Sequence, residues 1–179
     1  AVMFCCGAGI IWLCRPLMLM FRSNFYEAWQ FVPLLAIATV FSCFNQFLNT
    51  IYVVEKRSTL SLYTMLAGAL ANCVMNWLMI PVMGPNGATV ASLLSYVLVF
   101  ALRAVNTRGL LRVDFSLLRM SANTLLLLVE AAVMLAQPVG WPVWTTLLTG
   151  IVILFNFKGV WSLTKLMGLR LPGQRRHAR

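Results

Sequence analysis

The chain has 179 residues, of which 61% are hydrophobic and only 10% are charged. A soluble domain is about a quarter charged, so this composition excludes an ordinary water-covered surface and indicates that much of the surface faces lipid. Fourteen Lys and Arg against four Asp and Glu give a formal net charge of +10. In a soluble protein such an excess would suggest nucleic acid, but in a lipid-embedded chain its distribution is more informative, and we expect no nucleic-acid partner.

Apolar runs separated by charges predict six membrane crossings. Residues 28–54 and 58–102 carry no charge at all. Because about 20 apolar residues cross a hydrocarbon core roughly 30 Å thick, the second run is long enough for two crossings, divided by the Pro81–Asn86 break. The predicted crossings are 1–20, 28–53, 59–80, 86–103, 117–136 and 142–158, the last of which opens with Pro142, a favoured first-turn residue. We therefore expect an all-α integral membrane protein, with a six-helix transmembrane bundle over 1–164 and a basic cytoplasmic tail over 165–179.

The basic residues divide unevenly between the two sides of such a bundle. Twelve fall on one side: Lys56, Arg57, Arg103, Arg108, Arg112, Arg119, Lys158, Lys165, Arg170, Arg175, Arg176 and Arg179. The other side has only Arg15 and Arg22. Cytoplasmic loops of membrane proteins carry the excess of Lys and Arg, so both ends of the chain are predicted to be cytoplasmic and the turn at Gly84–Gly87 to lie outside the cytoplasm.

The start of the chain lies inside an apolar run, without a basic lead-in or a cleavage pattern of small residues. No signal peptide fits such a start. We therefore expect the chain to be the carboxy-terminal part of a longer protein.

Residues for catalysis or metal binding are scarce. The single histidine, His177, has no partner at a recognisable spacing, and no two of the four acidic residues lie within one helical turn. Nucleotide-binding glycine motifs and zinc-protease motifs are missing from the sequence. The five cysteines are odd in number and contain no C-x-x-C pair, which favours a packing role over disulfides or zinc. We expect no enzyme activity, no cofactor and no metal.

Polar residues within the predicted crossings are the candidate cavity or substrate residues. Glu130 lies near the middle of the fifth crossing, where an acid costs about 2.5–3.5 kcal/mol and should face a cavity or a partner. It could form a proton- or cation-linked site, or it could be a hydrogen-bonded acid facing neighbouring helices. Arg15 interrupts an apolar run beside Pro16. It could hold a diphosphate through paired N–H donors, or it could reach the lipid headgroups from the membrane interface.

Two pairs of asparagines are spaced four residues apart, so each pair occupies one helix face. Asn45 and Asn49 lie in the second crossing, and Asn72 and Asn76 lie in the third. Their amides could bind sugar hydroxyls in a cavity or couple helices by hydrogen bonds worth about 1 kcal/mol each. Small residues in the third and fourth crossings indicate close helix packing; they are Gly68, Ala69, Ala71, Gly87, Ala88 and Ala91.

A resemblance follows from residues 53–105. This stretch has a basic turn, two asparagines, an Ile-Pro pair, a Gly-x-x-Gly-Ala element and a Ser-Tyr pair; these are Lys56, Arg57, Asn72, Asn76, Ile80, Pro81, Gly84, Gly87, Ala88, Ser95 and Tyr96. In this pattern it resembles the carboxy-terminal domain of bacterial polysaccharide-biosynthesis membrane proteins, the oligosaccharide flippases. They belong to the multidrug/oligosaccharidyl-lipid/polysaccharide exporter superfamily. Residues 15–42 resemble the preceding segment of that family, except that Arg22 or Ser23 stands where a glycine is usual.

The resemblance implies two pseudo-symmetric helical bundles around a cavity lined with basic and polar residues. That cavity takes the head of a polyprenyl-diphosphate-linked oligosaccharide for cell-surface polysaccharide synthesis. This chain would supply most of the second bundle, in the bacterial inner membrane, and its partners would be the lipid bilayer, this substrate and an amino-terminal helical bundle. Two alternatives stay open. The first is a cation-coupled multidrug exporter of the same superfamily, with Glu130 as its acidic site. The second is a membrane polysaccharide polymerase or ligase, which the lack of a catalytic constellation disfavours.

Overall fold

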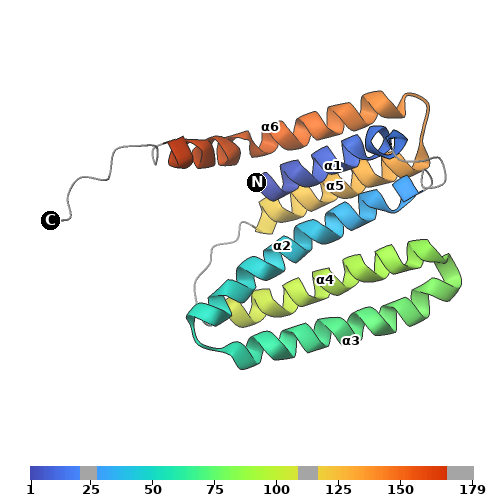
Figure 1. Ribbon diagram of the computed structural model, residues 1–179. Helices are drawn as coiled ribbons and strands as arrows, with labels where there is room; N and C mark the ends of the chain where they lie inside the picture. The colour runs from blue at the N-terminus through green and yellow to red at the C-terminus, as the bar shows by residue number, and fades with distance from the viewer. Residues whose placement is uncertain (21–27, 109–116, 169–179) are drawn as a thin grey trace.

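The computed structural model describes residues 1–20, 28–108 and 117–168 (Figure 1). Within these ranges the chain forms six helices and no strand, so the predicted all-α fold is confirmed. The helices are α1 (Val2–Leu19), α2 (Val32–Val54), α3 (Ser58–Met83), α4 (Pro85–Arg108), α5 (Leu117–Ala136) and α6 (Trp141–Gly168).

Consecutive helices run in opposite directions, so their ends gather at two ends of the bundle (Figure 1). We name these the Gly84 end, where α3 joins α4 and α5 joins α6, and the Lys56 end, where α2 joins α3. The α3–α4 and α2–α3 turns are short. Gly84 in the α3–α4 turn has a φ of 60°, and Lys56 in the α2–α3 turn has a φ of 54°.

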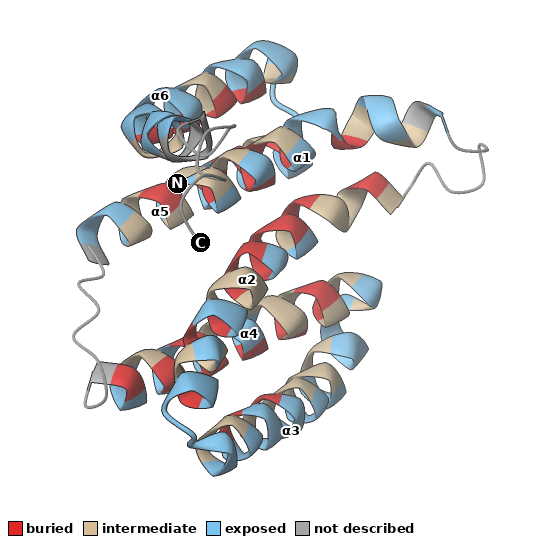
Figure 2. Cartoon of the chain, turned by 60° about the vertical axis from the view of Figure 1, so that its left-hand side comes forward, coloured by how far each residue is buried: buried red, intermediate tan, exposed pale blue. Residues whose placement is uncertain are grey.

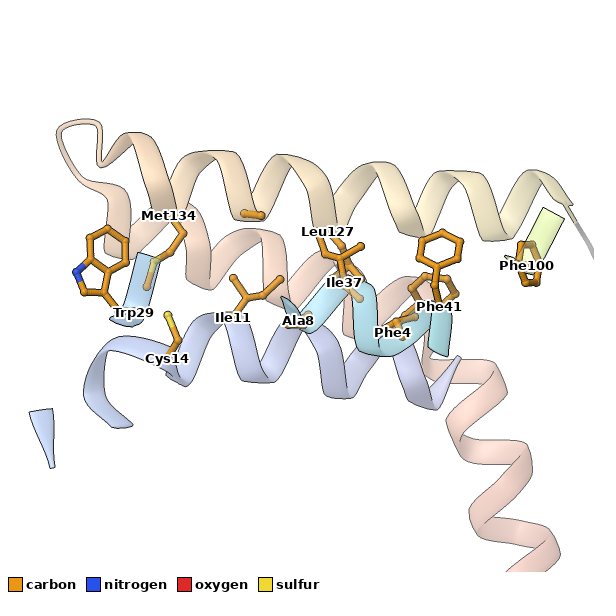
Figure 3. Packing of buried hydrophobic residues seen from close by; sticks show 14 of the residues in the cluster. Phe4, Ala8, Ile11, Cys14, Trp29, Ile37, Phe41, Phe100, Leu127 and Met134 are labelled. Atoms are coloured by element: carbon orange, nitrogen blue, oxygen red, sulfur yellow. The ribbon is translucent and has the colours of Figure 1, made fainter. Parts of the chain in front are cut away.

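Helix α2 lies between two groups of helices (Figure 2). On one side it packs against α1 and α5, which pack in turn against α6, and on the other side it packs against α4, which carries α3. The main apolar core fills the contact between α1, α2 and α5, where Ile11, Ile37, Leu127 and Met134 are 0–1% exposed (Figure 3). The core therefore joins α1, α2 and α5, and leaves α3 at the edge of the bundle.

The outer surface is apolar. Large hydrophobic side chains stand exposed on the outside of the helices, for example Leu70 at 67% and Leu154 at 75%. Five helices, α2 to α6, are long and apolar enough to cross a membrane by length and composition, and α1 is a shorter apolar helix. Exposure of so many large apolar side chains would be costly in water, and the long apolar helices fit a multi-pass membrane protein.

The helices extend further than the apolar runs predicted. Helix α3 continues through Pro81 to Met83, so the break between α3 and α4 narrows to Gly84. Helix α4 ends at Arg108 instead of 103, and α6 continues to Gly168, ten residues past the predicted end at 158. The reason is that a charged side chain ends an apolar run without ending the backbone hydrogen bonds of a helix. Lys165, assigned to the tail, therefore lies within α6, and residues 169–179 lie outside the described residues.

Small residues allow α3 and α4 to approach closely, as the sequence predicts. A Cβ atom added to Gly87 would collide with the backbone carbonyl of Met79, and one added to Gly68 would collide with the side chain of Val99. Ala91 is fully buried in the same contact. The hairpin of α3 and α4 is thus built on glycine and alanine at the positions where the two helices cross.

Candidate functional site: a polar groove between α2, α3 and α4

A groove of about 620 Å³ lies between α2, α3 and α4. It forms because α4 packs closely against both neighbours, whereas α2 and α3 make few contacts with each other. Its volume is within the usual range of small-ligand sites. Nine of the lining residues are polar: Ser42, Asn45, Gln46, Asn49, Asn72, Ser92, Ser95, Tyr96 and Arg103. The groove is therefore a polar concavity in a bundle whose remaining outer surface is largely apolar.

Arg103 is the only charged residue that lines the groove in the described part of the chain. Its side chain is 4% exposed, and it donates from Nε to Thr64 Oγ1 at 3.1 Å and from Nη1 to the carbonyl oxygen of Asn45 at 2.6 Å. Both acceptors are neutral, and no acidic side chain among the described residues forms an ion pair with it. Since a buried charge is costly unless it is paired, the groove has an unbalanced positive charge that suits an anionic group.

Asn45 and Asn49 connect α2 to the two helices across the groove. Asn45 Nδ2 donates to the carbonyl oxygen of Tyr96 on α4 at 2.9 Å, and Asn49 Oδ1 accepts from Ser61 Oγ on α3 at 2.5 Å. Both side chains also line the groove, and the Oδ1 atom of Asn45 is buried without a hydrogen-bond partner. The two roles that the sequence left open, helix coupling and cavity lining, are therefore combined in this pair.

Asn72 and Asn76 bond to each other along one face of α3. The Nδ2 atom of Asn76 donates to Asn72 Oδ1 at 2.8 Å, and only Asn72 lines the groove. The structure thus brings Asn45, Asn49 and Asn72 together at one site, and Asn76 supports Asn72 from the next helical turn.

Glu130 lies apart from the groove, in a polar seam between α5 and α6. It is fully buried; Oε1 accepts from Thr149 Oγ1 at 2.7 Å, and Oε2 has no hydrogen-bond partner among the described residues. Along the same seam, Asn156 Nδ2 donates to Asn123 Oδ1 at 2.5 Å. This position agrees with an acid that faces neighbouring helices, and it separates Glu130 from the asparagines with which it was grouped as a candidate.

Arg15 is also outside the groove, near the Gly84 end. Its guanidinium carbon lies over two indole rings, 4.4 Å from the centroid of Trp29 and 4.6 Å from that of Trp141. The side chain is half-buried. Arg15 was the candidate cation of the sequence analysis, and Arg103 is the cation of the groove. The structure places them in different helix groups.

Metal-binding side chains do not gather in the described part of the chain, where no three of His, Cys, Asp and Glu lie close together. The five cysteines are free thiols, and two of them, Cys6 and Cys73, are exposed. His177 lies outside the described residues.

Sequence reasoning missed Arg103, the charged residue of the groove, and also the polar lining residues Ser42, Gln46, Ser92, Ser95 and Tyr96. Arg103 was counted among the loop cations because the predicted crossing ended at 103. A signal was present in the spacing, because Ser92, Ser95, Tyr96, Val99 and Arg103 recur at intervals of three and four and thus share one helix face. Read as a polar stripe rather than as the end of a crossing, this pattern would have predicted a cationic groove.

The chain matches no protein-family model, no curated protein and no solved structure.

Proposed function

We propose that the chain is one half of a bacterial inner-membrane transporter that translocates lipid-linked oligosaccharides for cell-surface polysaccharide synthesis. The observation that carries the proposal is the groove between α2, α3 and α4, because it combines amides with an unpaired arginine inside an apolar bundle. A substrate that matches these groups has sugar hydroxyls and a phosphate near an apolar chain.

The residues divide this work by their chemistry. The carboxamides of Asn49 and Asn72 both donate and accept, as recognition of a sugar hydroxyl requires. Arg103 offers charge-assisted hydrogen bonds to a phosphate oxygen, and these are about twice as strong as neutral ones. The lipid chain would stay outside, against the exposed apolar side chains of α3 such as Leu70 and Trp77.

An amino-terminal bundle would cover the groove. Gln46 and Tyr96 line it and are exposed, Tyr96 at 41%. Exposed polar side chains at this depth of a membrane helix are costly against lipid, so they should face a second bundle, a water-filled cavity or the substrate. This is the arrangement that a two-bundle transporter provides.

Deletion of the gene tests the transport step. Loss of surface polysaccharide, with polyprenyl-linked repeat units accumulating inside the cell, is expected. Restoration by the wild-type gene and by Lys158→Gln, but not by Arg103→Gln, would assign the step to the groove, since Lys158 is an exposed cation of α6. Accumulation of drugs with normal surface polysaccharide would refute the proposal, as would full restoration by Arg103→Gln.

Orientation is tested separately by cysteine labelling. Single cysteines at Glu55 and Gly140, in a protein whose native cysteines are replaced, should react from opposite faces of the membrane, because they occupy opposite ends of the bundle. We expect the Glu55 position to be cytoplasmic, since Lys56 and Arg57 adjoin it. Labelling of both positions from one face would contradict the crossing pattern and the transport proposal with it.

A cation-coupled drug exporter is the second candidate, and Glu130 is the observation that favours it. A fully buried carboxylate with one unpaired oxygen has the chemistry of a proton- or sodium-linked site. Glu130→Gln distinguishes the two functions: a coupled exporter should lose ion-driven transport, whereas groove-dependent translocation of a lipid-linked saccharide should continue.

A further inference from the structure

We infer that Arg15, which contacts the indole rings of Trp29 and Trp141, forms a binding site for the phosphate of an anionic membrane lipid at the Gly84 end of the bundle. The inference depends on the chain lying in a bilayer, and it is independent of what the groove transports.

The guanidinium of Arg15 is held in place by two aromatic neighbours. Trp29 and Trp141 lie 4.4 and 4.6 Å from its carbon Cζ, within the distance at which a cation is attracted to an aromatic face. Trp29 is 7% exposed and is part of the main core (Figure 3), and Trp141 packs against that core. The arginine therefore keeps a fixed orientation, set by rings that are themselves fixed.

Contact with the two rings leaves the N–H donors of the guanidinium for another ligand. A cation–π contact uses the charge of the group, whereas its hydrogen atoms point outward in its plane. Nε is buried without a hydrogen-bond partner. No described residue accepts a hydrogen bond from Arg15 or forms an ion pair with it, so its charge lacks a counterion in the part of the chain that the structure describes.

The surroundings place this group at the boundary between lipid and water. Five of the six tryptophans lie towards the Gly84 end of their segments: Trp12, Trp29, Trp77, Trp141 and Trp144. Tryptophan gathers at the headgroup level of membranes, where its ring is amphipathic. Arg15 therefore lies at the depth at which lipid phosphates occur.

A lipid phosphate fits these conditions better than a soluble anion does. A phosphate presents two oxygens to the two parallel N–H bonds of a guanidinium. The exposed ring of Trp12, three residues before Arg15 and on the same face of α1, would contact the acyl chains. A soluble anion would gain only the first of these contacts.

The test is the thermal stability of the purified chain in dodecylmaltoside, a detergent without phosphate. Phosphatidylglycerol should raise the melting temperature of the wild type, whereas digalactosyldiacylglycerol and inorganic phosphate should not. In Arg15→Gln the phosphatidylglycerol increment should be lost, with lipid binding weaker by at least about tenfold, because one charge-assisted hydrogen bond alone accounts for such a factor and the guanidinium offers two. Arg15→Lys, which keeps the charge but not the planar donors, should retain only part of it.

Two controls make the result decisive. Lys158→Gln removes the same charge from an exposed site on α6 and should keep the full increment. Glu27→Gln should also keep it; an enlarged increment in this variant would mean that the acid, which lies outside the described residues, already neutralises Arg15, and the inference would fail. Because each variant is compared with itself, with and without lipid, a general loss of stability does not affect the reading. An equal increment in wild type and Arg15→Gln, or an equal effect of inorganic phosphate, would overturn the lipid site.

Discussion

Replacing Gly68 with alanine tests whether the close approach of α3 and α4 sets the floor of the groove. The added Cβ atom would collide with the side chain of Val99 on α4. Overpacking of this kind costs about 1–3 kcal/mol, and it is opposed by the gain of about 1 kcal/mol from replacing glycine inside a helix. The expected result is a net loss of about 1 kcal/mol.

The collision is with one side chain, so it should be relieved by shortening that side chain. Val99→Ala alone should destabilise the chain by loss of packing, but in combination with Gly68→Ala the two changes should compensate. We expect a coupling of about 1–2 kcal/mol between them. The measurement is unfolding in detergent by titration with sodium dodecyl sulfate, followed by circular dichroism.

Gly150→Ala is the matched control. It makes the same chemical change inside α6, where nothing lies within 4 Å of the added atom. Here the helix preference acts alone, and stability should rise by up to about 1 kcal/mol. Two results would contradict this reasoning: Gly68→Ala as stable as Gly150→Ala, or additive effects of Gly68→Ala and Val99→Ala in the double variant. Either would mean that the contact between Gly68 and Val99 does not set the floor of the groove.

Three further substitutions are measured by the same titration. Gly84→Ala should cost about 1–3 kcal/mol, since φ 60° and ψ −142° suit glycine alone; an unchanged midpoint would contradict this turn geometry. Asn123→Ala should cost about 1 kcal/mol by removing the acceptor of Asn156, and the double alanine variant should cost little more if the two act as a pair. Glu130→Gln keeps an acceptor for Thr149 and removes an unpaired charge, so stability should be retained or raised. A large loss would show that the carboxylate itself is needed for folding.

Much of the fold could be predicted because the membrane solvent imposes simple rules. The two uncharged runs predicted α2, α3 and α4, and the fifth predicted crossing, 117–136, coincides with α5. Helix ends were predicted less well, because a charge such as Lys158 ends an apolar run while α6 continues to Gly168. The length of a helix depends on backbone hydrogen bonds, which a hydropathy pattern does not report.

The candidate site could be predicted only in part. Residue spacing showed that Asn45 and Asn49 share one face of a helix, and both line the groove. Spacing within a helix cannot show which helices are neighbours, so Glu130 and Arg15 were grouped with the asparagines although they lie in another helix group. Arg103 was missed because its hydrogen-bond acceptors, Thr64 Oγ1 and the Asn45 carbonyl oxygen, are far from it in the chain. Spacing within one helix does not show such contacts.

The single-residue turn at Gly84 has a consequence for how the protein is made. It carries no charged side chain, and neither does any residue from 58 to 102 on its two sides. During synthesis α3 and α4 could therefore leave the translocon together as a hairpin, since no ion has to be moved through the hydrocarbon. An arginine introduced beside this turn would add such a burden, and glycosylation-site mapping of the nascent chain would show whether the hairpin then fails to insert.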